Sequence, residues 1–415
     1  MTELATAMKT TRKTPSAGAL LAAACDIVAG GGGLHALALR PLAQKLGVSV
    51  TVLATHFGDR AGVLAAICRA ASASDAVPFE RWRATLAAMG AMTPAMAADL
   101  AEAMLEEEAT ARRALSMLYV AMLHASASDP SLRPAFAGWA GQRRGFWDEF
   151  GRRAGIPGPM LACGWWHGYA IAEQFYGLAL DGNLPYRMLR RLCLQRLFAG
   201  PAAGSAAAAE DALFVHAGER MRHAMEPPAA GADSARVPAW LAPAARACGM
   251  RLAAEGIGGL THRAVAADIG IAHTTLSYRF PTQHHLVLAG LASITAHVLG
   301  AVDGPGLDDV QRLRSEGDGR KLDLARANCA VALAATHMPE LVPHTAHMRS
   351  RRGIHLARVF RKYLPDTPGI DALCAQVVSL GLTGLINSLP PGDACEQSVQ
   401  AAFTAAARWL QDRHR

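Results

Sequence analysis

The sequence predicts an all-α protein, and three observations lead to that prediction. Alanine, the strongest helix former, is the commonest residue in a chain that is 51% hydrophobic. Runs of β-branched residues, which buried strands would need, are scarce, and aromatic residues make up only 6% of the chain. Apolar residues in the most readable segments recur at helical spacing. We therefore expect helices packed on helices along the chain.

Length, charge and cysteine content narrow the classes of protein to consider. A chain of 415 residues suits two to four domains. Its net charge of +7 favours an anionic partner but does not by itself identify nucleic acid. No apolar run reaches the ~18 residues that span a bilayer, and we see no signal-type segment, so we expect a cytoplasmic protein with no membrane partner. The eight cysteines lack C-x-x-C pairs and zinc-type spacing, so we expect reduced thiols, no metal and no cofactor.

An internal repeat appears at an offset of 223 residues. The segment from Leu37 to Ile67 aligns without a gap to the segment that begins at Leu260. Alanine matches carry little weight in so alanine-rich a chain, and matches of other residue types carry more. The informative matched pairs are Cys25 and Cys248, Gly33 and Gly256, Arg40 and Arg263, Gly47 and Gly270, Leu53 and Leu276, and Phe57 and Phe280.

Each copy of the repeat has the pattern of a helix-turn-helix. In the second copy, Thr261 is placed to cap a short helix, Gly270 to end it, and a second short helix follows at about residues 272–278. In the first copy, Ser49 is placed to cap the second short helix. A long helix before each motif supplies the third wall of a small three-helix domain.

The second short helix of each copy leaves short or polar side chains outside when its apolar side chains face inward. A helix of this kind fits the major groove of DNA, and flanking basic side chains can contact phosphates. The predicted DNA-binding residues are Arg40, Lys45, Ser49, Val50, Thr51, Thr55 and His56 in the first copy, and Thr261, Arg263, His273, Thr274, Thr275, Ser277, Tyr278 and Arg279 in the second.

These motifs resemble the N-terminal domain of the TetR family of transcriptional regulators. The residues that carry the resemblance are Gly47-Val48-Ser49 with Leu53 and His56-Phe57 in the first copy, and Thr261-x-Arg263 with Gly270-Ile271, Thr275-Leu276 and Phe280-Pro281 in the second. The resemblance implies that each N-terminal domain binds DNA. It also implies that a variable helical C-terminal domain binds a small ligand, and that the last two helices of that domain pair with a second subunit.

The duplicated motif implies two TetR-like halves that pair within one chain, so we expect a monomer. The predicted domains are a basic arm at residues 1–13, a helix-turn-helix domain at 14–78, a helical ligand-binding and dimerisation-type domain at 79–226, a linker at 227–237, a second helix-turn-helix domain at 238–302 and a second helical domain at 303–415.

The two copies depart from the family pattern to different degrees. Ala54 and Ser277 stand where the family usually has a phosphate-contacting Tyr, although Tyr278 is adjacent in the second copy. A Thr that is frequent in the family is present as Thr275 but is Val52 in the first copy. We therefore predict two unequal reading units and an asymmetric or imperfectly palindromic DNA operator.

The resemblance favours a ligand-responsive repressor, and no catalytic motif points to an enzyme. The alternative is a helical protein of the same fold that binds a small molecule or a partner and has lost DNA binding in one or both copies. The poor polar set of the first copy favours that alternative. A salt-titrated DNA-binding experiment separates the two.

Aromatic and sulfur-containing side chains are candidates for an effector site. Packing between the halves is the other interpretation of the same residues, and both remain open. The basic segment from His344 to His355 lacks a carboxylate or cysteine to complete a metal site, which leaves a solvated basic face or a site for an acidic effector. The candidate ligand-binding residues are Met117, Met122, His124, Trp139, Trp166, His167 and Tyr169.

Overall fold

The computed structural model is helical throughout the residues it describes. These are residues 15–31, 33–200, 205–224, 238–303, 324–354, 356, 357, 360 and 370–412, so the predicted arm at 1–13 and linker at 227–237 lie outside them. The all-α prediction is confirmed for these ranges. The helices are α1 (Ala17–Ala29), η1 (Leu34–Ala36), α2 (Leu39–Leu46), α3 (Val50–Phe57), α4 (Arg60–Met89), α5 (Pro94–Ala109), α6 (Arg113–Ser128), η2 (Pro130–Leu132), α7 (Arg133–Arg153), α8 (Gly158–Ala162), α9 (Trp165–Leu180), α10 (Leu184–Ala199), α11 (Ser205–Ala224), α12 (Leu241–Gly259), α13 (His262–Asp268), α14 (His273–Arg279), α15 (Gln283–Asp303), α17 (Leu324–Ala335), η3 (Pro339–Leu341), α18 (Val342–Ser350), α20 (Ala372–Ser388) and α21 (Asp393–Asp412).

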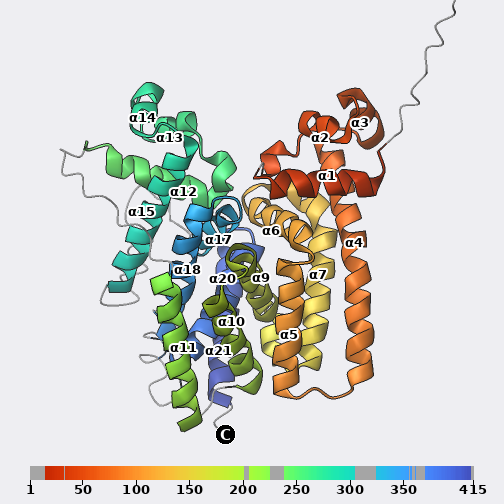
Figure 1. Ribbon diagram of the computed structural model, residues 1–415, viewed down its shortest axis with the longest axis vertical. Coiled ribbons are helices and arrows are strands. Elements are labelled where there is room, and N and C mark those ends of the chain that lie inside the picture. The colour runs from red at the N-terminus through yellow and green to blue at the C-terminus, as the bar shows by residue number, and fades with distance from the viewer. Residues whose placement is uncertain are drawn as a thin grey trace, which may run out of the picture.

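Two small helical units stand at one end of the molecule, above a body of longer helices (Figure 1). Unit 1 consists of α1 to α3, and unit 2 consists of α12 to α14. The first residues of α2, α3 and α4 each lie 223 positions before the first residues of α13, α14 and α15. The sequence repeat is therefore also a repeat of helix boundaries.

Glycine makes the tight turn inside each unit. Gly47 has φ 65° and ψ 29°, and Gly270, its counterpart in the repeat, has φ 68°. A side chain with a Cβ is disfavoured in this left-handed region, so glycine lets the chain leave one helix and enter the next within a few residues. The turn fixes the angle at which the second short helix leaves each unit.

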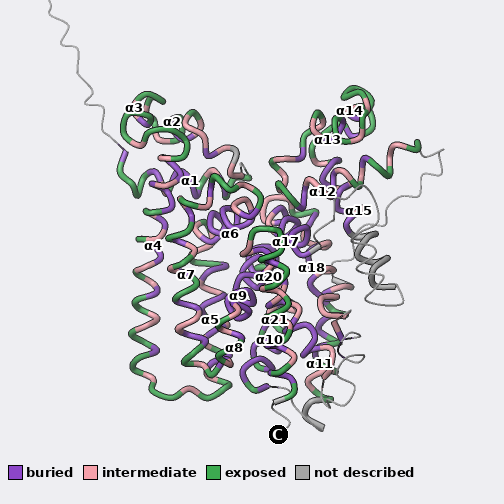
Figure 2. Tube along the Cα trace, turned by 180° about the vertical axis from the view of Figure 1, so that it is seen from behind, coloured by how far each residue is buried: buried purple, intermediate pink, exposed green. Residues whose placement is uncertain are grey.

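The body is built around two helices from opposite halves of the chain, α9 and α20. All sixteen residues of α9 are buried, and Figure 2 shows the buried trace concentrated where α9, α20 and α6 meet. On the outer side of the first half, α4 packs along α7. The apolar residues that the sequence places all around α9 are explained by this central position.

Glycines allow α9 and α20 to cross at backbone contact. A Cβ added at Gly384 would lie 1.7 Å from the carbonyl oxygen of Gly168, and a Cβ added at Gly168 would lie 2.3 Å from the carbonyl oxygen of Gly381. Any larger residue at these three positions would force the helices apart. The crossing joins residues 165–180 of the first half to residues 372–388 of the second.

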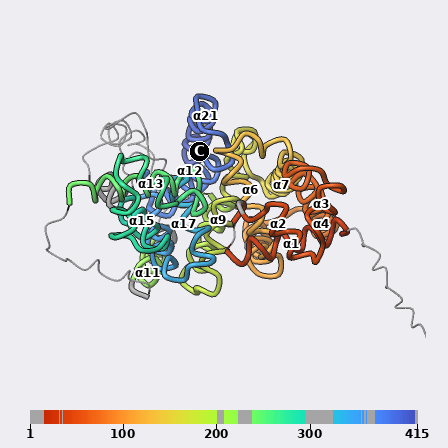
Figure 3. The backbone as a smooth tube through the Cα atoms, turned by 90° about the horizontal axis from the view of Figure 1, so that it is seen from above, coloured from red at the N-terminus to blue at the C-terminus, as the bar shows by residue number. Residues whose placement is uncertain are grey.

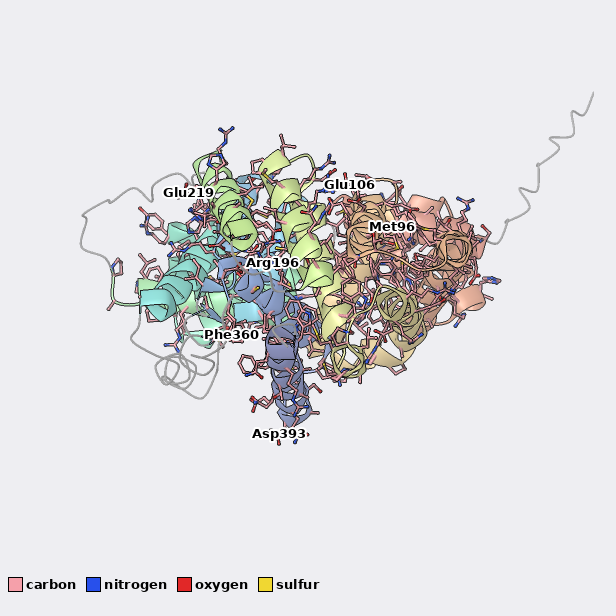
Figure 4. All side chains as sticks on the ribbon, turned by 90° about the horizontal axis from the view of Figure 1, so that it is seen from below. Met96, Glu106, Arg196, Glu219, Phe360 and Asp393 are labelled. Carbon is pink, nitrogen blue, oxygen red and sulfur yellow. The ribbon has the colours of Figure 1, made fainter. Side chains whose placement is uncertain are left out.

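A second junction between the halves is made by a buried arginine. Arg196 of α10 is fully buried and pairs with Glu210 of α11 at 2.9 Å and with Asp371, the N-cap of α20. Figure 4, seen from below, places Arg196 near the middle of the molecule, whereas Asp393 lies at the far end of the projecting helix α21. The halves are thus joined by a buried charge as well as by apolar packing.

Two further expectations concern membrane-spanning helices and the state of the eight cysteines. Within the described ranges, no helix is long and apolar enough to cross a membrane. None of the eight cysteines forms a disulfide, and all except Cys163 are buried. Burial raises the pKa of the Cys68 and Cys193 thiols to about 12, so they stay protonated and act as small packing residues.

Candidate nucleic-acid interface

The second short helix of unit 1, α3, presents a small and largely apolar face to solvent. Ser49 caps it, as predicted, by accepting a hydrogen bond from the backbone N–H of Val52 at 3.3 Å. Leu53 is fully buried and fixes the opposite face outward. The predicted inward and outward sides of this helix are therefore confirmed, and the exposed side chains are Val50, Thr51, Ala54, Thr55 and His56.

The second short helix of unit 2, α14, presents a richer face. Thr261 caps the preceding helix by accepting a hydrogen bond from a backbone N–H at 3.2 Å, and His262 Nε2 donates to the carbonyl oxygen of Phe280 at 2.5 Å. Leu276 is fully buried, whereas Tyr278 is 91% exposed. An aromatic side chain held this far into solvent is unusual for packing and suits a contact surface. The outward set is His273, Thr274, Thr275, Tyr278 and Arg279, with Ser277 half-buried.

The basic side chains predicted to flank the two faces have different surroundings. Arg40, Arg263 and Arg279 are exposed, and none of the described carboxylates pairs with them. Lys45, by contrast, pairs with Asp26 of α1 at 3.0 Å. The three arginines are therefore available to an anion, while Lys45 is engaged within its own unit.

An ion pair links the first helix to the second in both units, with reversed polarity. Asp26 of α1 pairs with Lys45 of α2, whereas Arg251 of α12 pairs with Asp268 of α13 at 2.5 Å. Lys45 and Asp268 occupy equivalent positions of the repeat. Each unit thus has an ion pair between its first and second helices, with the charges reversed and with the first-helix partner at a different repeat position.

Both outward faces lie at the same end of the molecule. Figure 1 places α3 and α14 at the top on opposite sides, and Figure 3, seen from above, places unit 1 and unit 2 on opposite sides of the central helix α9. The predicted DNA-binding residues are therefore gathered into two separate clusters on one surface.

One helix of the body contacts both units. Helix α6 packs against α1 of unit 1 and against α12 of unit 2. A Cβ added at Gly256 of unit 2 would lie 3.8 Å from Cδ2 of His124, which belongs to α6 in the first half. Reciprocally, a Cβ added at Gly31 of unit 1 would lie 3.6 Å from Cβ of His337 in the second half. Each unit is therefore contacted by the body of the other half.

The residues predicted to bind an effector are all buried in side-chain packing. Trp139 donates its indole N–H to Asp75 at 2.6 Å, and Trp166 donates to the carbonyl oxygen of Trp147 at 2.7 Å. The rings of Trp166 and Tyr169 stack at 5.8 Å. This burial supports the packing interpretation, and an effector pocket at these residues stays a prediction. The other predicted members are Met117, Met122 and His124 on α6 and His167 on α9.

A cluster of buried charges in the first half was not expected from the sequence. Arg143 donates to Asp75 at 2.5 Å and to Glu108 at 3.0 Å, and Gln174 of α9 also donates to Glu108 at 3.0 Å. Because a buried carboxylate is costly without such partners, the cluster ties α4, α5, α7 and α9 into one arrangement. Charged residues inside otherwise apolar helical faces are the signal that would have pointed to it.

A second buried ion pair joins the two halves and corrects one expectation. Arg349 lies in the basic segment expected to be solvated, yet it is fully buried and pairs with Glu173 of α9 at 2.7 Å. Tyr186 also donates to Glu173 at 3.0 Å. The solvated-face interpretation is therefore wrong for Arg349, because a carboxylate from the other half neutralises its charge. Glu173 is the sole carboxylate in α9, which is the sequence signal for this pair.

No protein-family model matches this sequence, and no match is found among curated proteins. Within the described residues, no group of three or more His, Cys, Asp or Glu side chains is arranged to hold a metal ion.

Proposed function

We propose that the chain is a sequence-specific DNA-binding regulator that uses unit 1 and unit 2 as two unequal recognition elements. One observation carries the proposal: the exposed faces of α3 and α14 lie at the same end of the molecule, and the first residues of these helices are 223 positions apart (Figure 1). Two helix-turn-helix units on one surface are suited to successive major grooves, which lie roughly 34–36 Å apart on one side of a duplex.

The charges of the two faces support an anionic partner. Arg40 beside α3, and Arg263 and Arg279 at α13 and α14, are exposed and without carboxylate partners among the described residues. Guanidinium groups bind phosphate oxygens well because two N–H donors can act together. Phosphate contacts fix the register of a protein on DNA, and the exposed side chains of Thr51, Thr55 and His273 can supply base contacts.

The proposal includes regulation by a small molecule, with repression as the form implied by the resemblance to the TetR family. Helix α6 packs on both units, so a ligand that moves this helix would change both units together. A small shift at a packed interface can change the distance between the two recognition helices. The ligand would act by binding more tightly to the arrangement that fits DNA poorly.

DNA selection tests the proposal directly. The full chain is used to select duplexes from a random pool, and the affinity of the winning duplex is measured by fluorescence anisotropy across a range of salt concentrations. We expect a selected sequence and an affinity that falls steeply with salt. Arg279→Gln should weaken binding and lower the salt slope by about 1. Arg220→Gln, an exposed arginine of α11, is the matched control and should leave both unchanged.

The inequality of the units makes a separate prediction about the selected sequence. Because α3 and α14 expose different side chains, one chain should bind an asymmetric or imperfectly palindromic site. Footprinting and the stoichiometry of the complex report this. A perfect palindrome occupied by two chains would contradict the single-chain pairing, and failure to retain any duplex would favour the alternative of a helical ligand-binding or partner-binding protein.

A further inference from the structure

Unit 2 carries a surface groove beside its second short helix. The groove has a volume of about 460 Å³ and lies between the start of α12 and the exposed side of α14. Its rim includes Tyr278, the most exposed of the large apolar or aromatic side chains described, and Trp240, which is half-buried against the core. The lining residues are Pro238, Trp240, Thr274, Thr275, Tyr278 and Arg279.

The equivalent positions of unit 1 cannot form the same groove. At the repeat offset of 223 residues, Ala17 stands where unit 2 has Trp240, and Thr55 stands where it has Tyr278. His56 replaces Arg279. Unit 1 therefore lacks both aromatic walls and the guanidinium group, although its backbone follows the same helix boundaries.

The lining residues combine a largely apolar surface with the guanidinium group of Arg279, which suits an apolar group that carries an anion. Arg279 and the two threonine hydroxyls can donate hydrogen bonds, and the lining contains no carboxylate. The ring faces of Trp240 and Tyr278 offer apolar surface on which a pentose can pack. A sugar–phosphate unit combines these two requirements, and the exposed position on α14 leaves room for the rest of an extended polymer.

We propose that this groove grips one sugar–phosphate unit of the DNA backbone. In this assignment Arg279 and the threonine hydroxyls bind the phosphate oxygens, and the sugar packs between Trp240 and Tyr278. The inference rests on the proposed function and adds a contact that unit 1 does not make. It assigns a positioning role to Trp240, a residue outside the helix-turn-helix motif.

Neutral phosphate substitution locates this contact. Each phosphate of the selected duplex is replaced in turn by an uncharged methylphosphonate, and binding to the full chain is measured. We expect one position at which the replacement weakens binding by about tenfold in the wild-type chain but has little effect in Arg279→Gln. If every methylphosphonate weakens binding equally in the wild-type chain and in Arg279→Gln, the assignment of a phosphate to this groove is overturned.

Substitutions of the aromatic walls test the second part of the assignment. Tyr278→Leu and Trp240→Phe keep an apolar side chain at each position, and thermal melting checks that both variants fold. A backbone grip predicts that Tyr278→Leu weakens selected and unrelated duplexes by a similar factor, about tenfold, because the backbone carries no sequence. Loss confined to the selected duplex would instead identify Tyr278 as a base-reading residue and overturn the grip.

Transplanting the rings into unit 1 provides a gain-of-function test. Ala17 and Thr55 are both exposed, so Ala17→Trp with Thr55→Tyr adds the aromatic walls without disturbing the core. Adding His56→Arg supplies the guanidinium, and the triple variant should bind DNA more tightly with a salt slope larger by about 1. No gain would contradict the grip. If the wild-type chain binds no duplex, the proposed function itself is contradicted. The failure of the grip and the failure of the proposed function are therefore distinguishable.

Discussion

Units 1 and 2 share a buried leucine in the second short helix and differ in what that helix exposes. Leu53 and Leu276 are equivalent in the repeat and both are fully buried. On the outer face, Thr55 of unit 1 stands where unit 2 carries the 91% exposed Tyr278. Interior positions are restricted because lost volume leaves a cavity, whereas an exposed position is restricted only by what it contacts. The two copies thus agree at this buried position and differ at this exposed one.

The ion pair between the first and second helices also differs between the two units, in the order of its charges. The Asp26–Lys45 contact of unit 1 and the Arg251–Asp268 contact of unit 2 both link a first helix to a second. Each needs opposite charges, but neither needs a particular polarity, since the Coulomb attraction is the same either way. A property that the fold requires is retained even when the residues that supply it are exchanged.

The largest expected effect tests whether the two interiors are equivalent. Leu53→Ala and Leu276→Ala should each lower the free energy of opening of their own unit by about 2–5 kcal/mol, because both remove a fully buried side chain. Hydrogen exchange of α2 and α3, and of α13 and α14, measures the two losses separately. Leu213→Ala on α11, where the side chain is 39% exposed, is the control and should change little. Clearly unequal losses would show that the two buried leucines do not stabilise their units equally.

A pH titration tests the burial of His167 in the body on which both units pack. Burial, assisted by Arg144 and Arg143, lowers the pKa of His167 to about 3 in the folded protein, whereas an unfolded histidine titrates near 6.5. Between these values the unfolded chain binds a proton that the folded chain does not, so stability should fall as the pH drops below about 6.5. Urea unfolding at several pH values measures this, and His167→Gln should flatten the dependence. The same loss of stability at low pH in His167→Gln would contradict the assignment of this dependence to His167.

The crossed histidine contacts predict effects in the opposite half. His337→Ala should speed hydrogen exchange in α1 of unit 1, and His124→Ala should do so in α12 of unit 2, each by about fivefold, because a packing contact worth about 1 kcal/mol is lost. His216→Ala on the exposed side of α11 serves as control. Faster exchange restricted to the half that carries the substitution would show that these contacts transmit nothing.

The smallest effect concerns the reversed ion pair. Lys45→Asp places two carboxylates together in unit 1 and should destabilise it by about 0.2–1 kcal/mol, the range of exposed pairs. Adding Asp26→Lys restores the attraction with the polarity of unit 2. Thermal melting of the single and double variants measures the recovery, which should shrink at high salt. A double variant no better than Lys45→Asp alone would show that polarity matters.

The units were predictable from the sequence because their signals are local. Capping by Ser49 and Thr261 and the glycine turns each depend on a few adjacent residues, and the repeat showed them twice. The buried pair of Glu173 and Arg349 was not predicted, because its members lie 176 residues apart and only the tertiary fold brings them together. The aromatic stretches were ambiguous for the same reason, since helical spacing places side chains on one face without showing what covers it.

The glycine crossing of α9 and α20 has a consequence for how the proposed regulator would respond to its own abundance. Two separate subunits must first meet before they bind a site, so occupancy at low copy number depends on the square of their concentration. Here the partners of the crossing, Gly168 on one side and Gly381 with Gly384 on the other, belong to one polypeptide and meet at a high effective concentration whatever the dilution. Occupancy of a DNA site would then rise in direct proportion to the number of chains, and a few molecules in a cell would already be assembled for binding.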